Sequence, residues 1–318
     1  MKPKFQFLNV VKVFGSLFIA GWCLQFFARF FWMFELASHF AVQYTIVALF
    51  FCIAHAVYRK WKLLLWFSVV LLWQIFIVCS IFLPQEEPQS QQTDQMTMLH
   101  FNVLRSNNNY DEVIDFIKNT KADFVCLQEV TFEWEKACQE LHELYPHRQG
   151  VSRGDSFGIL FLSRHSFSYS KIEYFSRSST PSIVVKINQQ NQEFTIIATH
   201  PLPPRTADYS ASRNEQLQAL AKYIGVVKNP LVVVGDLNMT PWSPYFSDFI
   251  NATGLKDSRQ GFGNQSSWPS MSFLLWIPID HLLLSPGGKV YKRTTMNNYG
   301  SDHYPIFTNF SLPINNKK

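Results

Sequence analysis

The chain has 318 residues, of which 47% are hydrophobic and only 16% are charged, against roughly 25% charged in an ordinary soluble protein. This composition excludes a disordered chain, a collagen-like repeat and a disulfide-framed miniprotein. The chain has 28 basic and 23 acidic residues. The first 83 positions hold seven of the basic residues and one of the acidic residues, which leaves 21 basic and 22 acidic residues from position 84 onward. The formal charge of +5 therefore belongs to the first quarter of the chain.

Three long apolar runs occupy that first quarter. Residues 63–83 carry no charge and have about the length of a helix that crosses the ~30 Å hydrocarbon core of a bilayer. Residues 36–58 form a second uncharged run, and residues 5–28 form a weaker first one around Lys12, whose side chain can reach the interface. We expect residues 1–83 to be a membrane region of about three transmembrane helices. A cleaved signal peptide followed by core helices is disfavoured, because no small-residue cleavage site is evident.

The placement of lysine and arginine predicts the orientation of these helices. Basic residues flank the N-terminus and the turn at 59–62, whereas the other turn balances Arg29 with Glu35. The positive-inside rule puts the N-terminus and the turn at 59–62 in the cytoplasm. Three crossings of the inner or plasma membrane then leave everything after Leu83 outside the cytoplasm, in the periplasm of a Gram-negative cell. If the first span is not real, the domain lies on the opposite side.

Residues 84–97 are rich in glutamine and interrupted by prolines, which predicts a flexible linker that keeps the following domain near the bilayer. From residue 98 to 313, short apolar runs alternate with helix-period segments, which indicates one α/β domain of two packed sheets covered by helices, before a tail at 314–318. The expected strands are 98–103, 124–128, 158–162, 183–187, 194–199, 231–234 and 281–284. The expected helices are 110–119, 132–145 and 209–227, the last capped by Asp208 or Ser210, and a hairpin turn is expected at 188–191.

Several of these strands end in a polar side chain of the metal-binding or acid–base type. Each such residue alone has an ordinary structural explanation, such as a helix cap or a buried histidine. Strand ends in a sandwich point towards one rim, however, so the set as a whole predicts a single functional site. The residues are Asn102, Glu129, His200, Asp236, Asp280, Asp302 and His303. Cys126 and Cys138 are expected to be unpaired thiols.

The segments around these residues resemble the endonuclease/exonuclease/phosphatase superfamily, the deoxyribonuclease I-like fold, over essentially all of 98–313. The resemblance is carried by HFNV, LQEV, ATHP, GDLNMTPWSP, PIDHLL and GSDHYPI, and GDLN and SDHYP are specific in that order and spacing. It implies a four-layer α/β/β/α sandwich of two mixed sheets and a hydrolase of phosphate ester bonds that uses Mg²⁺, or alternatively Mn²⁺. The N-terminal arrangement resembles uncharacterised bacterial members with an extracytoplasmic catalytic domain.

The resemblance implies roles for the acidic and amide residues. Glu129 would be the principal metal ligand, with Asn102 and Asp302 completing or orienting its shell, since Mg²⁺ prefers oxygen ligands and keeps several waters. Asp236 would hold and orient the attacking water. Asn238 would steady that water or a phosphoryl oxygen.

The histidines would bind the phosphate and move protons. His303 would do both, with Asp280 on its other ring nitrogen to fix the tautomer and raise its basicity. His200 would stabilise charge on the phosphate or protonate the leaving oxygen. The carboxylate partner of His200 stays open, with Asp155 as the nearest candidate. His281 follows Asp280 on a strand, so it points to the opposite face and is expected to be structural.

The substrate class stays open between nucleic acid and a lipid headgroup, with phosphomonoesters also possible. Arg205 and Arg213 flank the expected rim and can bind an anion, although a solvated helix face explains Arg213 equally well. Trp242, and either Trp268 or Trp276, can stack on a base or lie against lipid. The domain lacks the basic stripe typical of enzymes that bind long duplexes, and its closeness to the bilayer favours lipid. The alternative is a catalytically inactive receptor or scaffold that retains the fold; no protein partner can be inferred.

Overall fold

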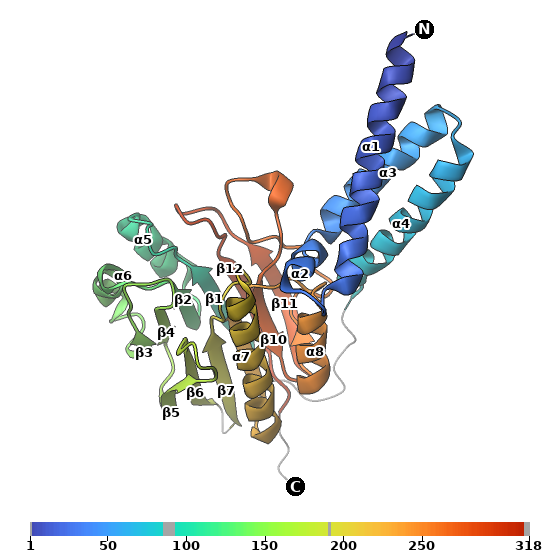
Figure 1. Ribbon diagram of the computed structural model, residues 1–318. Helices are drawn as coiled ribbons and strands as arrows, with labels where there is room; N and C mark the ends of the chain where they lie inside the picture. Colours follow the sequence, from blue (N-terminus) through green and yellow to red (C-terminus); the bar gives the residue numbers. More distant parts are fainter. Residues whose placement is uncertain (1, 85–92, 190–191, 315–318) are drawn as a thin grey trace.

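The computed structural model describes residues 2–84, 93–189 and 192–314, with side chains from residue 12 onward, and joins an N-terminal group of helices to a two-sheet sandwich (Figure 1). The helices project from one side of the sandwich. Their bounds are α1 (Lys2–Leu24), α2 (Trp32–Ser38), α3 (Ala41–Val57) and α4 (Trp61–Cys79), with single 3₁₀ turns η1 (Gln25–Phe27) and η2 (Ser80–Phe82) after α1 and α4.

The sandwich consists of two six-stranded sheets, with strand orders β11-β12-β1-β2-β4-β3 and β5-β6-β7-β8-β10-β9. Both sheets are mixed, because β1 and β2 run parallel, as do β7 and β8, while the other neighbours are antiparallel. The strands of the first sheet are β1 (Met96–Asn102), β2 (Phe124–Gln128), β3 (His147–Val151), β4 (Ile159–Ser163), β11 (Lys289–Thr295) and β12 (Ile306–Ser311). Those of the second sheet are β5 (Phe167–Tyr174), β6 (Pro181–Gln189), β7 (Gln192–Thr199), β8 (Leu231–Asp236), β9 (Lys256–Asp257) and β10 (Asp280–Leu284).

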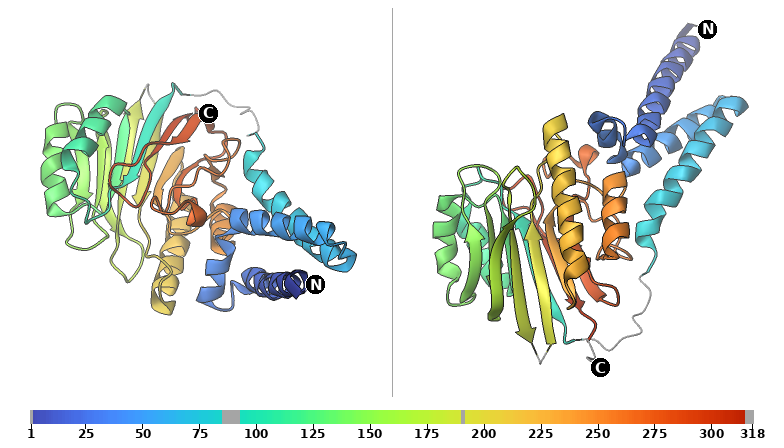
Figure 2. Two further views of the ribbon diagram at one scale, coloured as in Figure 1. Left: turned by 90° about the horizontal axis from the view of Figure 1, so that it is seen from above. Right: turned by 60° about the horizontal axis from the view of Figure 1, so that its bottom comes forward.

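Helices cover the outer face of each sheet, which completes the four layers (Figure 2). One apolar cluster packs α5 and α6 on the first sheet, and another packs α7 and α8 on the second. The helices are α5 (Tyr110–Thr120), α6 (Phe132–Ala137), α7 (Ala207–Val226) and α8 (Pro244–Thr253), with 3₁₀ turns η3 (Cys138–Leu141) and η4 (Phe273–Leu275). The predicted α/β sandwich of two mixed sheets is confirmed.

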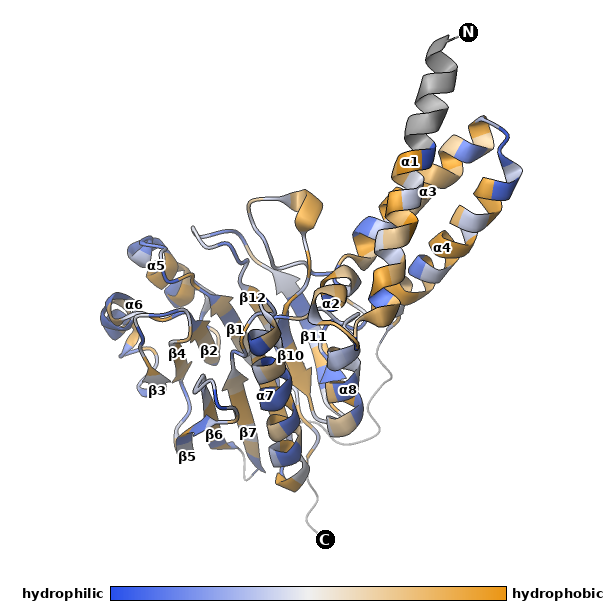
Figure 3. Ribbon diagram, viewed as in Figure 1, coloured by the Kyte–Doolittle hydropathy of each residue, from blue (hydrophilic) through white to orange (hydrophobic). Residues whose placement is uncertain are grey.

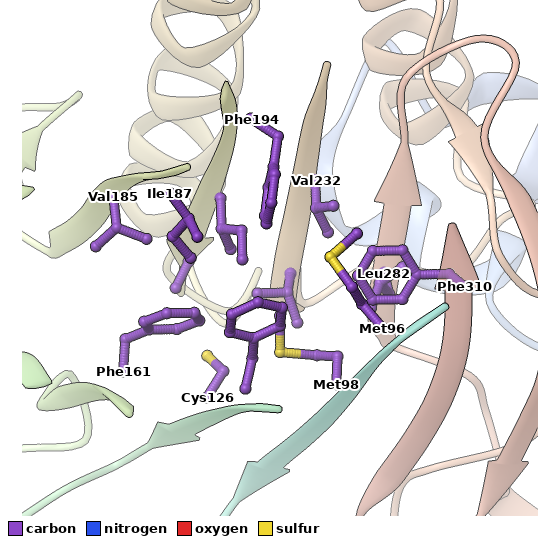
Figure 4. Packing of buried hydrophobic residues seen from close by; sticks show 14 of the residues in the cluster. Met96, Met98, Cys126, Phe161, Val185, Ile187, Phe194, Val232, Leu282 and Phe310 are labelled. Carbon is purple, nitrogen blue, oxygen red and sulfur yellow. The ribbon is translucent and has the colours of Figure 1, made fainter. Parts of the chain in front are cut away.

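The core between the sheets is built by strand alternation (Figure 4). Side chains two positions apart share one face of a strand. Met96 and Met98 of β1 therefore lie between the sheets, whereas Leu99 and Phe101 pack under the helices. The same rule applies to the other central strands, whose inward residues include Phe124, Cys126, Phe161, Val185, Ile187, Phe194, Val232, Leu282 and Phe310.

Seven expected strands and three expected helices occur close to their predicted positions, with three local differences. The first strand begins at Met96, two residues inside the expected linker. Thr206, rather than Asp208 or Ser210, caps α7, by accepting a hydrogen bond from the Tyr209 amide at 3.2 Å. The expected helix at 132–145 divides into α6 and η3. Residues 85–92 of the linker, 190–191 of the hairpin turn and 315–318 of the tail lie outside the described residues.

The N-terminal region differs more from its prediction. Within the described residues, one helix, Trp61–Phe82, is long and apolar enough to cross a membrane. A second candidate exists only if Lys12–Phe27 and Trp32–Ser38, which meet at a bend of 115°, are counted as one broken span. The expected second run, 36–58, is interrupted at His39, so that α3 has 17 residues. The three expected spans are therefore reduced to one clear candidate, although most of the coloured ribbon of the N-terminal helices has the colour of hydrophobic residues (Figure 3).

Candidate active site

Polar residues end the inter-sheet face of five strands at one rim of the sandwich. Four of them lie two positions from an apolar core residue of the same strand, and Asn102 lies two positions beyond the buried His100, so the alternation that fills the core also aims these side chains inward. The antiparallel β10 begins at this rim, where its first residue pairs with the last residue of β8. The five residues are Asn102 on β1, Gln128 on β2, His200 directly after β7, Asp236 on β8 and Asp280 on β10.

A buried dyad of His303 and Asp280 forms the centre of the rim. The Nδ1 atom of His303 lies 2.9 Å from Oδ2 of Asp280, which fixes the imidazole and directs Nε2 towards Asp236. Burial by itself lowers the pKa of His303, but the charge of Asp280, its hydrogen bond and the nearby Asp236 and Asp302 outweigh burial and raise that pKa to about 10. The imidazolium form is thus favoured in the absence of any bound cation.

The Asp236 carboxylate lies between two imidazoles. Its Oδ2 is 3.6 Å from Nε2 of His200 and 3.6 Å from Nε2 of His303, while its Oδ1 accepts a hydrogen bond from the Asn238 amide at 2.8 Å. Asn238 has a φ of 53°, in the left-handed region, and its side-chain amide donates to the Pro201 carbonyl at 3.0 Å. This strained turn after β8 fixes both residues at the pocket.

Gly235 explains the close approach of β7 and β8 beneath that turn. A Cβ atom at this position would lie 1.9 Å from the Thr199 carbonyl oxygen, and the residue has a φ of 151°. Only glycine avoids this overlap. The glycine of the GDLN segment therefore allows His200 and Asp236, at the ends of neighbouring strands, to meet.

Two buried residues that the sequence reasoning missed hold the carboxylates in place. Gln128 accepts a hydrogen bond from the Asp236 amide at 2.9 Å and donates to the Thr199 carbonyl at 2.9 Å, so it links the two sheets. His100 contacts Oε1 of Gln128 through Nε2 at 3.0 Å, and its Nδ1 lies 3.4 Å from Oδ1 of Asp280. Burial lowers the pKa of His100. The sequence did contain a signal for both residues. His100 lies two positions before Asn102 and Gln128 two positions after Cys126, so both belong to the inward face of their strands.

Three residues at the rim carry side-chain oxygen atoms that could hold a cation. Glu129, with a φ of 61°, turns back to the pocket, where Oε1 accepts from Asn102 at 3.3 Å and Oε2 from the Arg105 amide at 3.1 Å. Asp302 accepts from the indole of Trp268 at 3.0 Å through Oδ2, but its buried Oδ1 has no hydrogen-bond partner among the described atoms. A buried carboxylate oxygen without a donor fits a hard cation such as Mg²⁺, which one or two carboxylates and several waters satisfy.

A second set of potential ligands, Asp236, Asp280 and His303, has one ligand atom of each residue within 4.8 Å of the others. The 2.9 Å contact between Nδ1 of His303 and Asp280 already uses one nitrogen of this set. A metal bound through that nitrogen would break this contact. Glu129, Asn102 and Asp302, which offer oxygen atoms alone, therefore fit a hard cation better, and the second set fits acid–base chemistry.

The rim forms the floor of a pocket of about 850 Å³. Arg105 and Arg205, both exposed, supply cations at its edge. Trp268 also lines the pocket, in keeping with one of the expected stacking positions. The rim residues that line the pocket are Glu129, His200, Asp236, Asn238, Asp302 and His303, and Asn102 and Asp280 lie buried behind them.

The structure places two expected substrate-binding residues elsewhere. Arg213 is fully buried, and its Nη2 donates to Oε2 of Glu35 at 2.6 Å, so the expectation that it binds an anionic substrate is replaced by an internal ion pair. Trp242 is half-buried and is not among the residues that line the pocket.

Asp155, the candidate carboxylate partner of His200, binds another residue. Asp155 accepts two hydrogen bonds from Arg153, at 2.8 Å and 2.6 Å, and Nδ1 of His200 has no hydrogen-bond partner among the described atoms. His281 is buried and contacts the Met239 carbonyl at 2.8 Å, as expected of a structural histidine. Both Cys126 and Cys138 are buried and free, as predicted.

Comparisons with known proteins agree with this architecture. The model of the Endonuclease/Exonuclease/phosphatase family matches residues 99–303. D. rerio TDP2 complexed with a single-strand DNA product is 15% identical, with a TM-score of 0.59, over 69% of this chain and 99% of that chain. The endonuclease/exonuclease/phosphatase from Bacteroides vulgatus is 17% identical, with a TM-score of 0.56, over 69% and 100%. At these identities the solved structures show a shared fold. No curated protein matches the sequence.

Proposed function

This chain belongs to the Endonuclease/Exonuclease/phosphatase family, and from that premise we propose that it is a divalent-metal-dependent phosphodiesterase held at a membrane by its N-terminal helices. The observation that carries the proposal is the position of Asp236. Its Oδ2 lies 3.6 Å from each of two buried imidazole nitrogens, one of which belongs to the dyad of His303 and Asp280. Members of this family hydrolyse phosphate esters, and these groups suit that reaction.

In the proposed reaction, water attacks phosphorus and the bond from phosphorus to one ester oxygen breaks. Asp236 orients the water and accepts its proton. His303, protonated and held by Asp280, donates to a phosphoryl oxygen, and His200 on the other side of Asp236 gives a proton to the departing oxygen. The products are a phosphomonoester and an alcohol. A divalent cation held by Glu129, Asn102 and Asp302 would neutralise charge on the phosphate.

The substrate of the proposed reaction is a phosphodiester of nucleic acid or of a lipid headgroup. The fold shared with TDP2, solved with a single-strand DNA product, favours nucleic acid. The N-terminal helices favour lipid, since one of them is long enough to cross a bilayer. We further propose that the catalytic domain lies outside the cytoplasm. A C-terminal fusion to alkaline phosphatase should then be active and a fusion to green fluorescent protein dark, and the reverse result would invert the orientation.

The test of the reaction uses the full chain in detergent with bis-p-nitrophenyl phosphate. We expect turnover with Mg²⁺ or Mn²⁺ and none with EDTA. Asp236→Ala should lower kcat/KM by about a thousandfold, because general acid–base groups contribute roughly 10² to 10⁴. Asp115→Asn, on a carboxylate whose side chain is 72% exposed on α5, is the matched control and should change nothing. Equal rates for the native protein and Asp236→Ala would overturn the mechanism, and no turnover of any phosphate ester would favour the inactive receptor or scaffold.

A further inference from the structure

One wall of the catalytic pocket comes from the N-terminal helices. Trp32 and Leu36 of α2, with His39 and Phe40 directly after it, line the same pocket as Asp236. They lie more than 150 positions from that residue along the chain. The pocket thus has a polar floor from the sandwich and a largely apolar wall from the segment that precedes the apolar helices α3 and α4.

Buried polar contacts hold α2 in this position. Glu35 is fully buried, and its two carboxylate oxygens accept from Arg213 of α7 at 2.6 Å and from Ser243, the N-cap of α8, at 2.7 Å. The ring of His39 lies 3.1 Å from the Thr240 hydroxyl. Removal of one member of a buried ion pair is strongly destabilising, and both carboxylate oxygens of Glu35 are engaged in these contacts. The wall is therefore a fixed part of the site.

A second apolar surface is the loop 271–276 around η4, which lies along the chain between the pocket-lining residues Trp268 and Ile277. Met271 is 90% exposed, Phe273 72% and Leu274 66%. The side-chain amide of Gln43, on α3, donates to the Leu274 and Trp276 carbonyls, at 3.3 Å and 3.0 Å. This loop and the N-terminal helices rise from the same side of the domain (Figures 1 and 3). The loop 271–276 therefore lies beside the start of α3.

The polar floor of the pocket and the apolar surfaces of the α2 wall and the loop together favour an amphiphilic substrate. The floor presents carboxylates, imidazoles and a cation site, which suit a phosphate. The α2 wall and the loop present alkyl groups beside their indole and phenyl rings. A nucleobase can stack on the rings, but alkyl groups such as Leu36, Met271 and Leu274 gain free energy only against apolar material. A polynucleotide would leave these surfaces in contact with its charged backbone, and among the pocket-lining residues only Arg105 and Arg205 carry a cationic side chain besides the histidines.

From these observations we propose that the substrate is a lipid phosphate ester taken from the bilayer in which the N-terminal helices lie, with its apolar part against Trp32, Leu36 and Phe40. The loop 271–276 enters the same leaflet and brings the pocket mouth to the headgroups. This proposal rests on the proposed function, since it names the substrate of the same site. It makes α2 a specificity-determining element of the enzyme.

The test compares two kinds of substrate for the full chain. One is a vesicle of phosphatidylcholine, phosphatidylethanolamine and phosphatidylglycerol, assayed for release of soluble phosphate compounds, and the other is bis-p-nitrophenyl phosphate. We expect Trp32→Ala and, separately, Leu36→Ser to lower the ratio of lipid to soluble activity about tenfold, roughly the effect of removing one apolar contact of 1.4 kcal/mol. Phe273→Ser should also lower this ratio. Phe132→Ser, at a residue 63% exposed on α6 across the domain, is the matched control and should leave it unchanged.

The outcomes separate the two proposals. Hydrolysis of the soluble ester without hydrolysis of the vesicle lipid, or faster cleavage of a single-stranded oligonucleotide than of lipid, would overturn the lipid substrate while leaving the phosphodiesterase intact. An unchanged ratio in both Trp32→Ala and Leu36→Ser would also overturn it. If the native chain hydrolysed neither the soluble ester nor the vesicle lipid, the proposed function itself would be refuted. Thermal unfolding of each variant identifies any change that comes from lost structure.

Discussion

The carboxylates of two buried charge clusters in this chain are partnered in different ways. In the cluster that docks α2, both carboxylate oxygens of Glu35 accept hydrogen bonds and the Arg213 guanidinium lies over the ring of Tyr245 at 5.2 Å, while the nitrogens Nη1 of Arg213 and Nε2 of His39 have no hydrogen-bond partner among the described atoms. At the rim, a carboxylate oxygen itself, Oδ1 of Asp302, is buried without a partner among the described atoms, as is Nδ1 of His200.

The difference indicates which carboxylate stabilises the fold and which one can accept a cation. A carboxylate whose two oxygens both accept hydrogen bonds has little capacity to bind a cation, and removal of one member of its ion pair leaves the other charge uncompensated. A buried carboxylate oxygen without a partner is costly to keep, so in a native structure it points to a ligand, ion or catalytic role. We therefore expect substitutions in the α2 cluster to lower stability and substitutions at the rim to lower activity.

The largest effect on stability should come from Glu35→Ala. It leaves the Arg213 guanidinium buried and unpaired, which costs about 3–5 kcal/mol. Denaturant unfolding of the full chain in detergent measures the loss, and Glu143→Ala, at an exposed carboxylate on the outer surface, is the control. The double variant Glu35→Leu with Arg213→Met should recover most of it. A destabilisation below about 1 kcal/mol would remove the distinction between the clusters.

At the rim, Asp280→Asn should lower kcat about a hundredfold, within the range of general acid–base groups. The same change should lower the pKa of His303, because the charge of Asp280 is the main influence that raises it. In the metal-free native chain His303 should stay protonated beyond pH 8, since its pKa is about 10, whereas in the variant it should lose its proton at lower pH. NMR titration of labelled histidines checks this, and an unchanged His303 titration would contradict the dyad.

Metal binding gives a third, smaller effect. At ten times the dissociation constant, Mg²⁺ or Mn²⁺ should stabilise the native chain by about 1.4 kcal/mol, from binding to the folded state alone. Glu129→Gln should abolish this gain, since it removes an anionic ligand. The thermal midpoint with metal and with EDTA reports the difference. A gain of equal size in Glu129→Gln would move the metal to the alternative set of Asp236, Asp280 and His303.

The smallest effect should come from an exposed contact of the same N-terminal region. Arg29 binds Asp248 of α8 through both Nη atoms, one of them at 2.8 Å, yet the two side chains are 55% and 50% exposed. Exposed pairs contribute about 0.2–1 kcal/mol and weaken with salt. Asp248→Asn should therefore change the free energy of unfolding by less than about 1 kcal/mol, measured as for Glu35→Ala. A loss as large as that of Glu35→Ala would show that burial does not decide the strength of these contacts.

The sequence predicted most internal strands and the rim because both depend on local patterns. An apolar run such as 231–234 predicts a buried strand, and a polar residue two positions further on has its side chain on the same face of that strand, at the rim. The internal strand β12 was missed because half of its residues are polar, and the edge strands β3, β5, β9 and β11 were missed because their sequences are short or polar and, in β5, largely exposed. Edge strands of this kind have little hydropathic signal.

The α2 wall could not be predicted, because hydropathy alone merges Leu36 with the apolar run that follows it. The chain turns at His39 and Phe40 with neither glycine nor proline to mark the break. A signal did exist in Glu35, the one acidic residue of the first 83 positions. An isolated carboxylate in such surroundings requires a partner, but nothing in the sequence identifies Arg213, 178 positions away, as that partner.

The short connection between the helices and the sandwich starts and ends at docked points. Beyond α4, the Ile81 carbonyl accepts from the Gly261 amide at 2.9 Å, and a Cβ atom at Gly263 would lie 2.7 Å from the Phe82 ring. At the far end, the Thr93 amide donates to the Leu312 carbonyl at 2.9 Å. The length of the connection consequently does not set the position of the sandwich relative to the N-terminal helices. Insertion of glycine and serine residues between 85 and 92 should leave the position of the pocket relative to the N-terminal helices unchanged. Doubling the length of a loop adds only about 0.6 kcal/mol of closure entropy, which does not displace the docked ends.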